Sequence, residues 1–220
     1  MSRLSSCCAA ILLALPLGAA ADPVTIVSET RGTIDANTLV MSLLDLYPES
    51  GTTVLPFSVR IETAFDPDSP EVYLDVEGLP TIWRSQVDFR LTVGERSLSF
   101  NGMARVSAGD DAWNDFRHRV TFSSPQGYEI YFTQALTGWA PPDSDAYAPR
   151  ALDSADGLRG SFGLLAYPSN PDAPGLWDTG ANADYASLRV IAAVPEPGQW
   201  GMLAAGLLVA GAGARRLRRA

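Results

Sequence analysis

The alternation of apolar and polar residues over 87–93 constrains the fold more than any other feature of this chain. The apolar positions are Val87, Phe89, Leu91 and Val93, and the positions between them hold Asp88, Arg90 and Thr92. Successive side chains of a β-strand point to opposite faces, so a period of two gives one apolar and one polar face. The segment therefore predicts a half-buried strand.

Turn residues follow this strand at two places. Gly94-Glu95 has the glycine-first order of a two-residue type II′ turn, which would pair Leu91 with Leu98 and Phe89 with Phe100. Asn101-Gly102 is typical of a type I′ turn, so residues 103–107 are expected to return as a third strand. The stretch predicts an antiparallel meander.

Further short strands, separated by Gly, Pro, Asp and Ser, are predicted along the chain. They cover residues 24–27, 39–44, 56–65, 71–76, 119–123, 128–133, 161–167 and 185–192. Many short strands with such connections favour an all-β fold, an antiparallel β-sandwich of jelly-roll or Ig-like character. About 170 residues, from 22 to 194, are enough for one such domain.

The amino terminus has the three parts of a secretory signal peptide. Arg3 supplies a positive charge, Ala9 to Leu17 an apolar stretch, and Ala19 to Ala21 a small-residue cleavage site before Asp22. We expect signal peptidase to remove residues 1–21 by cutting between Ala21 and Asp22. Both cysteines of the sequence lie in that segment, so the mature domain has to fold without disulfides and has no thiolate nucleophile.

The mature domain is acidic. Without Arg3, the four tail arginines and Glu196, residues 22–194 carry 11 basic and 24 acidic residues, a net charge near −13. Nucleic acid is an unsuitable partner, because phosphate binding needs a basic surface. The chain contains no lysine, which excludes Schiff-base chemistry.

The carboxyl terminus, residues 195–220, combines a polar motif, an apolar stretch and a basic cluster in that order. Pro195-Glu196-Pro197 is followed by the apolar residues 200–214, for which a short transmembrane helix is expected. The four basic residues of the segment 215–219 form a positive stop. They are Arg215, Arg216, Arg218 and Arg219.

This tail resembles the PEP-CTERM sorting signal. The resemblance covers the tail only, and it implies a Gram-negative protein that is exported, held briefly in the inner membrane and processed near Pro195–Pro197 by an exosortase. Proteins with this signal are associated with exopolysaccharide and biofilm. The expected destination is the cell surface or extracellular matrix. An ordinary tail-anchored protein with a chance Pro-Glu-Pro is the alternative.

Catalytic residues are poorly marked in this sequence. His118 is the only histidine, and neither a Gly-x-Ser-x-Gly elbow nor a metal-binding histidine pair accompanies it. We interpret His118 as a surface or turn histidine and expect the protein not to be an enzyme. Paired carboxylates of a glycoside hydrolase have many candidates, but their separation in space is not readable from sequence.

Two acidic clusters are candidate calcium ligands, although no cofactor is expected. One contains Asp66 and Asp68, and the other contains Asp110, Asp111 and Asp115. Carboxylates at alternate positions suit a hard cation, but neither cluster matches an EF-hand loop. Solvated turns are the simpler interpretation.

Three tryptophans in predicted loops are candidate glycan contacts. A flat aromatic ring can stack on the apolar face of a sugar ring. Trp113 lies among acidic residues, and Trp139 and Trp177 lie in long loops with Tyr147 and Tyr167 nearby. The simpler interpretation is that these tryptophans fold back and cap the ends of the sandwich. The leading functional prediction is a noncatalytic protein of the cell surface or matrix, associated with extracellular polysaccharide. The alternatives are a carbohydrate-binding module that uses these loop aromatics and an extracellular hydrolase.

Overall fold

The structure is a computed structural model, and it describes most of the region between the two predicted sorting signals. The described residues are 23–36, 41, 44–46, 53–66, 69, 71–76, 78–110, 115–124, 127–138, 147–169 and 177–191. They belong to one compact unit, Pro23–Ala192. The second unit, Met1–Asp22 with Ala193–Ala220, lies outside them.

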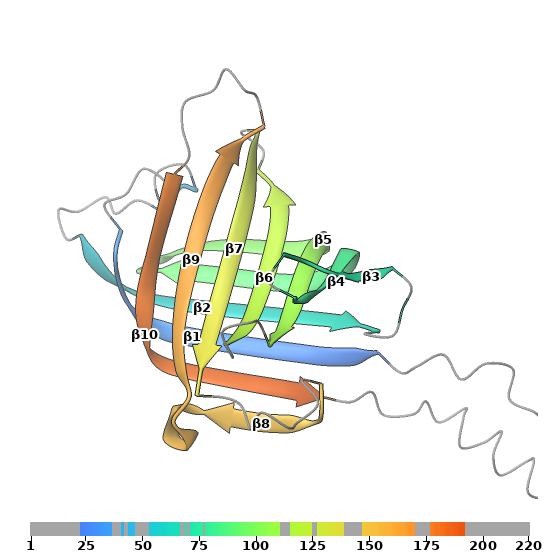
Figure 1. The fold of residues 1–220 in the computed structure, drawn as a ribbon. Coiled ribbons are helices and arrows are strands. Elements are labelled where there is room, and N and C mark those ends of the chain that lie inside the picture. Colours follow the sequence, from blue (N-terminus) through green and yellow to red (C-terminus); the bar gives the residue numbers. More distant parts are fainter. Residues whose placement is uncertain are drawn as a thin grey trace, which may run out of the picture. The chain divides into compact units, whose positions relative to one another are not determined.

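Ten β-strands and one short 3₁₀ helix make up the described part of this unit (Figure 1). The strands are β1 Val24–Asp35, β2 Val54–Phe65, β3 Val72–Leu74, β4 Pro80–Val93, β5 Arg96–Asp110, β6 Phe116–Ser123, β7 Tyr128–Thr137, β8 Arg150–Asp153, β9 Arg159–Pro168 and β10 Trp177–Ile191, and the helix is η1, Ser154–Asp156.

Eight of these strands form a closed antiparallel β-barrel. Their order is β1-β2-β4-β5-β6-β7-β9-β10, and β10 pairs back onto β1. Strands β3 and β8 lie off the ring, paired with β4 and β10. The all-β prediction is confirmed, but the predicted sandwich is wrong. A sandwich has two separate sheets, whereas here one sheet closes on itself and leaves no free edge within the ring.

The closure depends on β10, which pairs with two strands of the ring along different parts of its length. Its first half pairs with β9 and its second half with β1 (Figure 1). The β1–β10 register shifts after Arg31, a bulge that bends the strands. At Gly32 a Cβ would lie 3.0 Å from the carbonyl oxygen of Asn182. Glycine allows the backbones to approach closely at this bend.

The turn predicted at Gly94-Glu95 is confirmed, and the one predicted at Asn101-Gly102 is wrong. Leu91 pairs with Leu98 and Phe89 with Phe100, and Gly94 has a φ of 59°, as the first position of a type II′ turn requires. Strand β5 instead runs straight through residues 101–102, which pair with Asp88 and Val87. Continued pairing with the long strand β4 overrides the local turn preference.

The other predicted strands mostly lie inside observed ones. Residues 24–27, 56–65, 119–123, 128–133 and 161–167 fall in β1, β2, β6, β7 and β9, and 185–191 in β10. The strand predicted at 71–76 is shortened to β3, and most of residues 39–44 lie outside the described residues. Strand β8 was not predicted, because no apolar alternation marks it.

The barrel interior contains two apolar clusters separated by a layer of buried polar residues. One cluster centres on Phe89 and Phe132, and the other on Phe116 and Leu188. Each of the strands β1, β2, β4, β6 and β7 contributes inward residues to both clusters, and the inward positions between the two clusters are polar. These positions are Ser28, Thr30, Thr63, Ser85, His118 and Gln134, all buried.

The fold-class prediction also included a transmembrane helix at 200–214. No helix in the described part of the chain is long and apolar enough to cross a membrane. Residues 200–214 themselves lie outside that part. This element of the prediction therefore has no counterpart in the described structure.

Candidate functional site

A groove of about 320 Å³ lies on the outer face of the barrel, where β5, β6 and β7 are neighbours. Strand pairing aligns Arg105, Thr121 and Tyr131 in one row across these strands and Ser107, Arg119 and Thr133 in the next. Along each strand these residues alternate with inward residues of the barrel, so their side chains point to the outer face. A wider depression of about 420 Å³ continues it toward β9. Both share Arg119, Tyr131 and Thr133 as lining residues.

Residues 71–76 with 78 and 79, which we call the flap, lie beside the groove, and residues 73–76 form its other wall. The flap contains β3 and contributes Tyr73, Leu74, Asp75 and Val76 to the lining. Leu74 is 69% exposed and Val76 fully exposed. The flap therefore presents apolar side chains at the rim, above a polar and aromatic floor.

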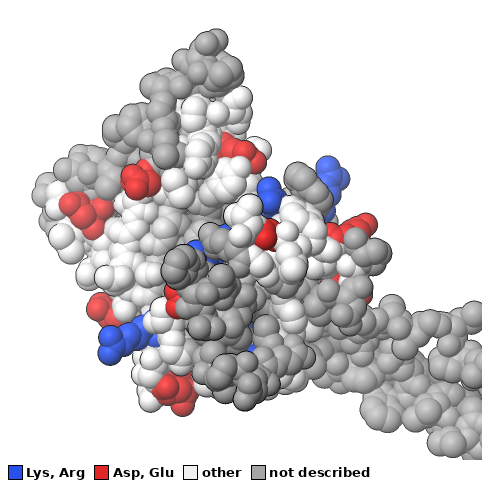
Figure 2. Space-filling view, in the orientation of Figure 1, with Lys and Arg blue, Asp and Glu red and all other residues white. Residues whose placement is uncertain are grey.

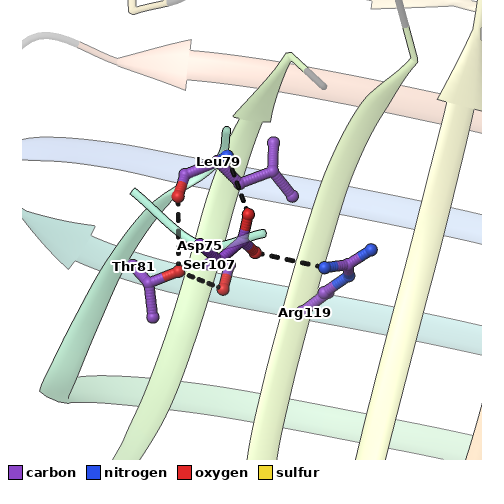
Figure 3. Close-up of polar contacts among 5 residues, drawn as sticks. All are labelled: Asp75, Leu79, Thr81, Ser107 and Arg119. Atoms are coloured by element: carbon purple, nitrogen blue, oxygen red, sulfur yellow. Dashed lines mark hydrogen bonds and ion pairs between the residues drawn. The ribbon is translucent and has the colours of Figure 1, made fainter. Parts of the chain in front are cut away.

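Asp75 adds side-chain contacts to the backbone pairing of β3 with β4 that attaches the flap to the barrel (Figure 3). Its Oδ1 accepts a hydrogen bond from the Leu79 amide at 2.9 Å, and its Oδ2 accepts from Nη1 of Arg119 on β6 at 3.2 Å. Beneath them the hydroxyls of Thr81 and Ser107 are 2.7 Å apart. The side chain of Asp75 is only 9% exposed and that of Arg119 23%. One carboxylate therefore closes the turn of the flap and contacts an arginine of the groove floor.

Three tyrosines line the groove and its continuation. The guanidinium of Arg105 lies over the ring of Tyr73, 5.8 Å from its centre. Tyr131 and Tyr167 meet edge to face with ring centres 5.1 Å apart. The hydroxyl of Tyr131 donates to Oε2 of Glu129 at 2.9 Å. Burial, followed by this hydrogen bond to Glu129, raises the pKa of Tyr131, so its phenol is neutral at physiological pH.

Charges of both signs balance within the groove. Arg105 and Arg119 face Asp75 and Glu129 among the lining residues. Figure 2 likewise shows acidic and basic side chains scattered over the visible described face, without a large patch of one sign. The groove combines cationic donors, anionic acceptors and aromatic rings, and is suited to an amphipathic ligand with little net charge.

The interior polar layer contains a second arrangement of potentially chemical residues. The Oγ of Ser28 lies 2.7 Å from Nδ1 of His118 and also contacts Oε1 of Gln134. The amide nitrogen of Gln134 donates to the Thr30 hydroxyl at 2.9 Å and to the Val59 carbonyl at 3.4 Å. His118 and Gln134 are fully buried.

The hydrogen-bond directions in this layer follow from the groups that can only accept. The Val59 carbonyl requires the nitrogen of the Gln134 amide, so the amide oxygen faces Ser28. Ser28 therefore donates its one proton to Gln134, and Nδ1 of His118 has to be the donor to Ser28. Nε2 is then an acceptor, with no hydrogen-bond partner among the described residues.

This geometry corrects the interpretation of His118 as a surface or turn residue. Its position in β6 is inward, between Phe116 and Val120, and burial lowers the pKa of His118 to about 3. A neutral imidazole whose Nδ1 donates to Ser28 does not act as a base toward that hydroxyl. The Ser28–His118 pair is therefore suited to a structural role.

The predicted calcium residues are only partly described. Asp66 follows β2, and its backbone carbonyl accepts from the Ser69 amide at 3.2 Å. Asp115 directly precedes β6. The side chain of Asp110, together with Asp68 and Asp111, lies outside the described part. Within the residues that are described, no group of three or more His, Cys, Asp or Glu side chains could hold a metal ion.

The predicted glycan contacts and sorting residues fall mostly outside the described structure. Trp113 and Trp139 are not described, and for Trp177 only the backbone, at the start of β10, is described. The signal cleavage site at Ala21 and Asp22 and the whole tail also lie outside the described residues. The tyrosines and arginines of the groove were not predicted as site residues. Their outward strand positions were readable, but the pairing that unites them was not.

Comparison with protein-family models, with curated proteins and with solved structures finds no match.

Proposed function

We propose that this protein is an exported, noncatalytic binding protein of the cell surface or extracellular matrix, and that its outer groove binds a polysaccharide. The observation that carries this proposal is the groove itself, in which Tyr73 and Tyr131 lie with Arg105, Arg119 and Asp75. Aromatic faces suit the C–H face of a sugar ring, and the charged groups suit its hydroxyls. The binding residues differ from the loop tryptophans considered in the sequence.

Delivery to that location is proposed from the two ends of the chain. The resemblance of residues 195–220 to a PEP-CTERM signal supports processing by an exosortase, after signal peptidase has removed residues 1–21. A polysaccharide-binding barrel released at the cell surface would attach to the matrix without a lasting anchor.

The noncatalytic part of the proposal is supported by the position of His118. The only histidine of the sequence is fully buried inside the barrel and engaged with Ser28. It does not line the groove. A histidine-dependent hydrolase would need this side chain beside its substrate.

Binding is tested with the full chain, purified in detergent, by affinity electrophoresis in gels that contain single soluble polysaccharides. Retardation by at least one polysaccharide, reduced about tenfold in affinity by Tyr131→Ala, is expected because a stacking ring contributes on the order of 1 kcal/mol. Tyr185→Ala is a matched control, since Arg31 lies over Tyr185 at 5.4 Å outside the groove. No retardation by any polysaccharide would refute the proposed function.

A further inference from the structure

We infer that the ligand of the groove is an uncharged polysaccharide, of which one sugar ring contacts Tyr131 on the barrel wall and Tyr73 on the flap. This inference rests on the proposed function and specifies the ligand class. It follows from the charge balance of the groove, from the hydrogen-bonding capacity of its side chains and from the way the flap is fixed.

The charges of the groove disfavour an anionic polymer. The carboxylate of Asp75 lies beside Arg119, and that of Glu129 accepts from the Tyr131 hydroxyl. A uronic acid or sulfated sugar near these arginines would also approach both carboxylates. It would in addition approach a mature domain with a net charge near −13, which repels polyanions at low salt.

Sugar hydroxyls match the remaining chemistry. A hydroxyl donates one hydrogen bond and accepts others, so it can satisfy a guanidinium and a carboxylate in the same site. Arg105 and Arg119 supply donors within the groove, while Glu129 supplies an acceptor beside Tyr131. The volume of about 320 Å³ falls in the lower range of small-ligand sites, about 300–1,000 Å³.

The open continuation of the groove favours a polymer over a single sugar. It extends past Tyr131 to Leu165 and Tyr167 on β9. Gly163 on β9 pairs with Thr133, and a Cβ at Gly163 would meet no atom within 4 Å. The sugars that follow the one bound at Tyr131 can therefore extend along the surface of β9.

The flap makes Asp75 a positioning residue for this site. Asp75 contacts Arg119 on β6 and closes the turn of the flap through the Leu79 amide, while Leu74 and Val76 are exposed at the rim. Asp75→Asn keeps the size of the side chain but removes its charge. We expect Asp75→Asn to weaken polysaccharide binding several-fold, and Arg60→Gln, in an exposed pair with Glu62, to leave it unchanged.

The test compares neutral and acidic polysaccharides at low and high salt. The neutral probes are dextran, galactomannan, xyloglucan and hydroxyethylcellulose, and the acidic probes are alginate and polygalacturonate. The full chain should bind at least one neutral probe with an affinity that hardly changes with salt. Tyr131→Ala and Tyr73→Ala should each lower that affinity about tenfold, whereas Tyr131→Phe should retain most of it because the ring remains.

Different failures of this test have different meanings. Salt-sensitive binding of the acidic probes alone, lost in Tyr131→Ala, would overturn the uncharged ligand but keep a polysaccharide site in the groove. Binding lost in Trp113→Ala or Trp177→Ala but kept in Tyr131→Ala would overturn the groove site and leave a polysaccharide-binding protein. Absence of binding to all probes would overturn both proposals. Tyr131→Phe guards against misfolding, since it removes only one hydroxyl.

Discussion

Arg119 donates a hydrogen bond from Nη1 to Oδ2 of Asp75 at 3.2 Å, and this contact joins the flap to the barrel wall. The two residues are 44 positions apart in the chain. Both side chains are largely shielded from water, so the pair is less screened than an exposed one.

Asp75→Ala is expected to destabilise the flap. The change removes the ion pair and leaves the Leu79 amide without its side-chain acceptor, at a cost of about 1–3 kcal/mol. Amide hydrogen exchange should become faster at Leu79 and Gly78, while β7 and β9 keep their protection. Glu62→Gln, in an exposed pair with Arg60, should change stability by less than about 0.5 kcal/mol. Unchanged exchange at Leu79 would show that Asp75 does not hold the flap.

His118 should make the barrel lose stability as the pH falls. The pKa of His118 is about 3 in the folded state and near its ordinary value of 6.5 in the unfolded chain, so below pH 6.5 the unfolded chain binds the extra proton. Stability is therefore full above pH 6.5 and declines toward pH 3, by about 1.4 kcal/mol per pH unit. Urea unfolding at several pH values between 5 and 7 measures this slope.

The control for this pH dependence is His118→Gln, which cannot titrate. Carboxylates titrate mainly below about pH 5, so the window from 5 to 7 isolates the histidine. The substituted protein should be less stable at pH 7, because Ser28 loses its imidazole donor. Its stability should nevertheless be nearly flat across the window. An equal slope in both proteins would exclude His118 as the cause.

Two glycines that pair across β9 and β10 should respond oppositely to substitution. A Cβ at Gly180 would lie 2.7 Å from the Phe162 carbonyl oxygen, whereas one at Gly163 would have open space. Gly180→Ala is expected to cost about 1–3 kcal/mol through backbone displacement near the barrel closure. Gly163→Ala should be neutral or slightly stabilising, by up to about 1 kcal/mol. Thermal unfolding compares the two, and equal effects would contradict the close approach at Gly180.

The sorting proposal predicts a defined product in the native host. Intact mass and peptide mapping of the exported protein should give a chain that begins at Asp22 and ends near Pro195–Pro197. A mature chain that retains the arginines of residues 215–219 would refute processing by an exosortase.

Some of the fold and site was readable from local pattern alone. Alternation marks the strand at 87–93, and Gly94 sets the hairpin that pairs Leu91 with Leu98. The same parity applies to His118, which shares the inward face of β6 with Phe116 and Val120, but the predicted strand begins only at Arg119. These features were accessible because they depend on neighbours in the chain.

The tertiary structure decided the rest, because the relevant partners are distant in sequence. A period of two predicts an inward face for a sandwich and a barrel alike, and only the pairing of β1 with β10 closes the ring. Pairing with β4 likewise overrode the turn signal at Asn101-Gly102. The groove exists because the pairing of β5, β6 and β7 places Arg119 and Tyr131 in adjacent rows of the barrel wall, beside a flap from another part of the chain. The sequence by itself determines the residue types and which side chains of a strand share a face. Which strands become neighbours depends on the free energy of the whole fold.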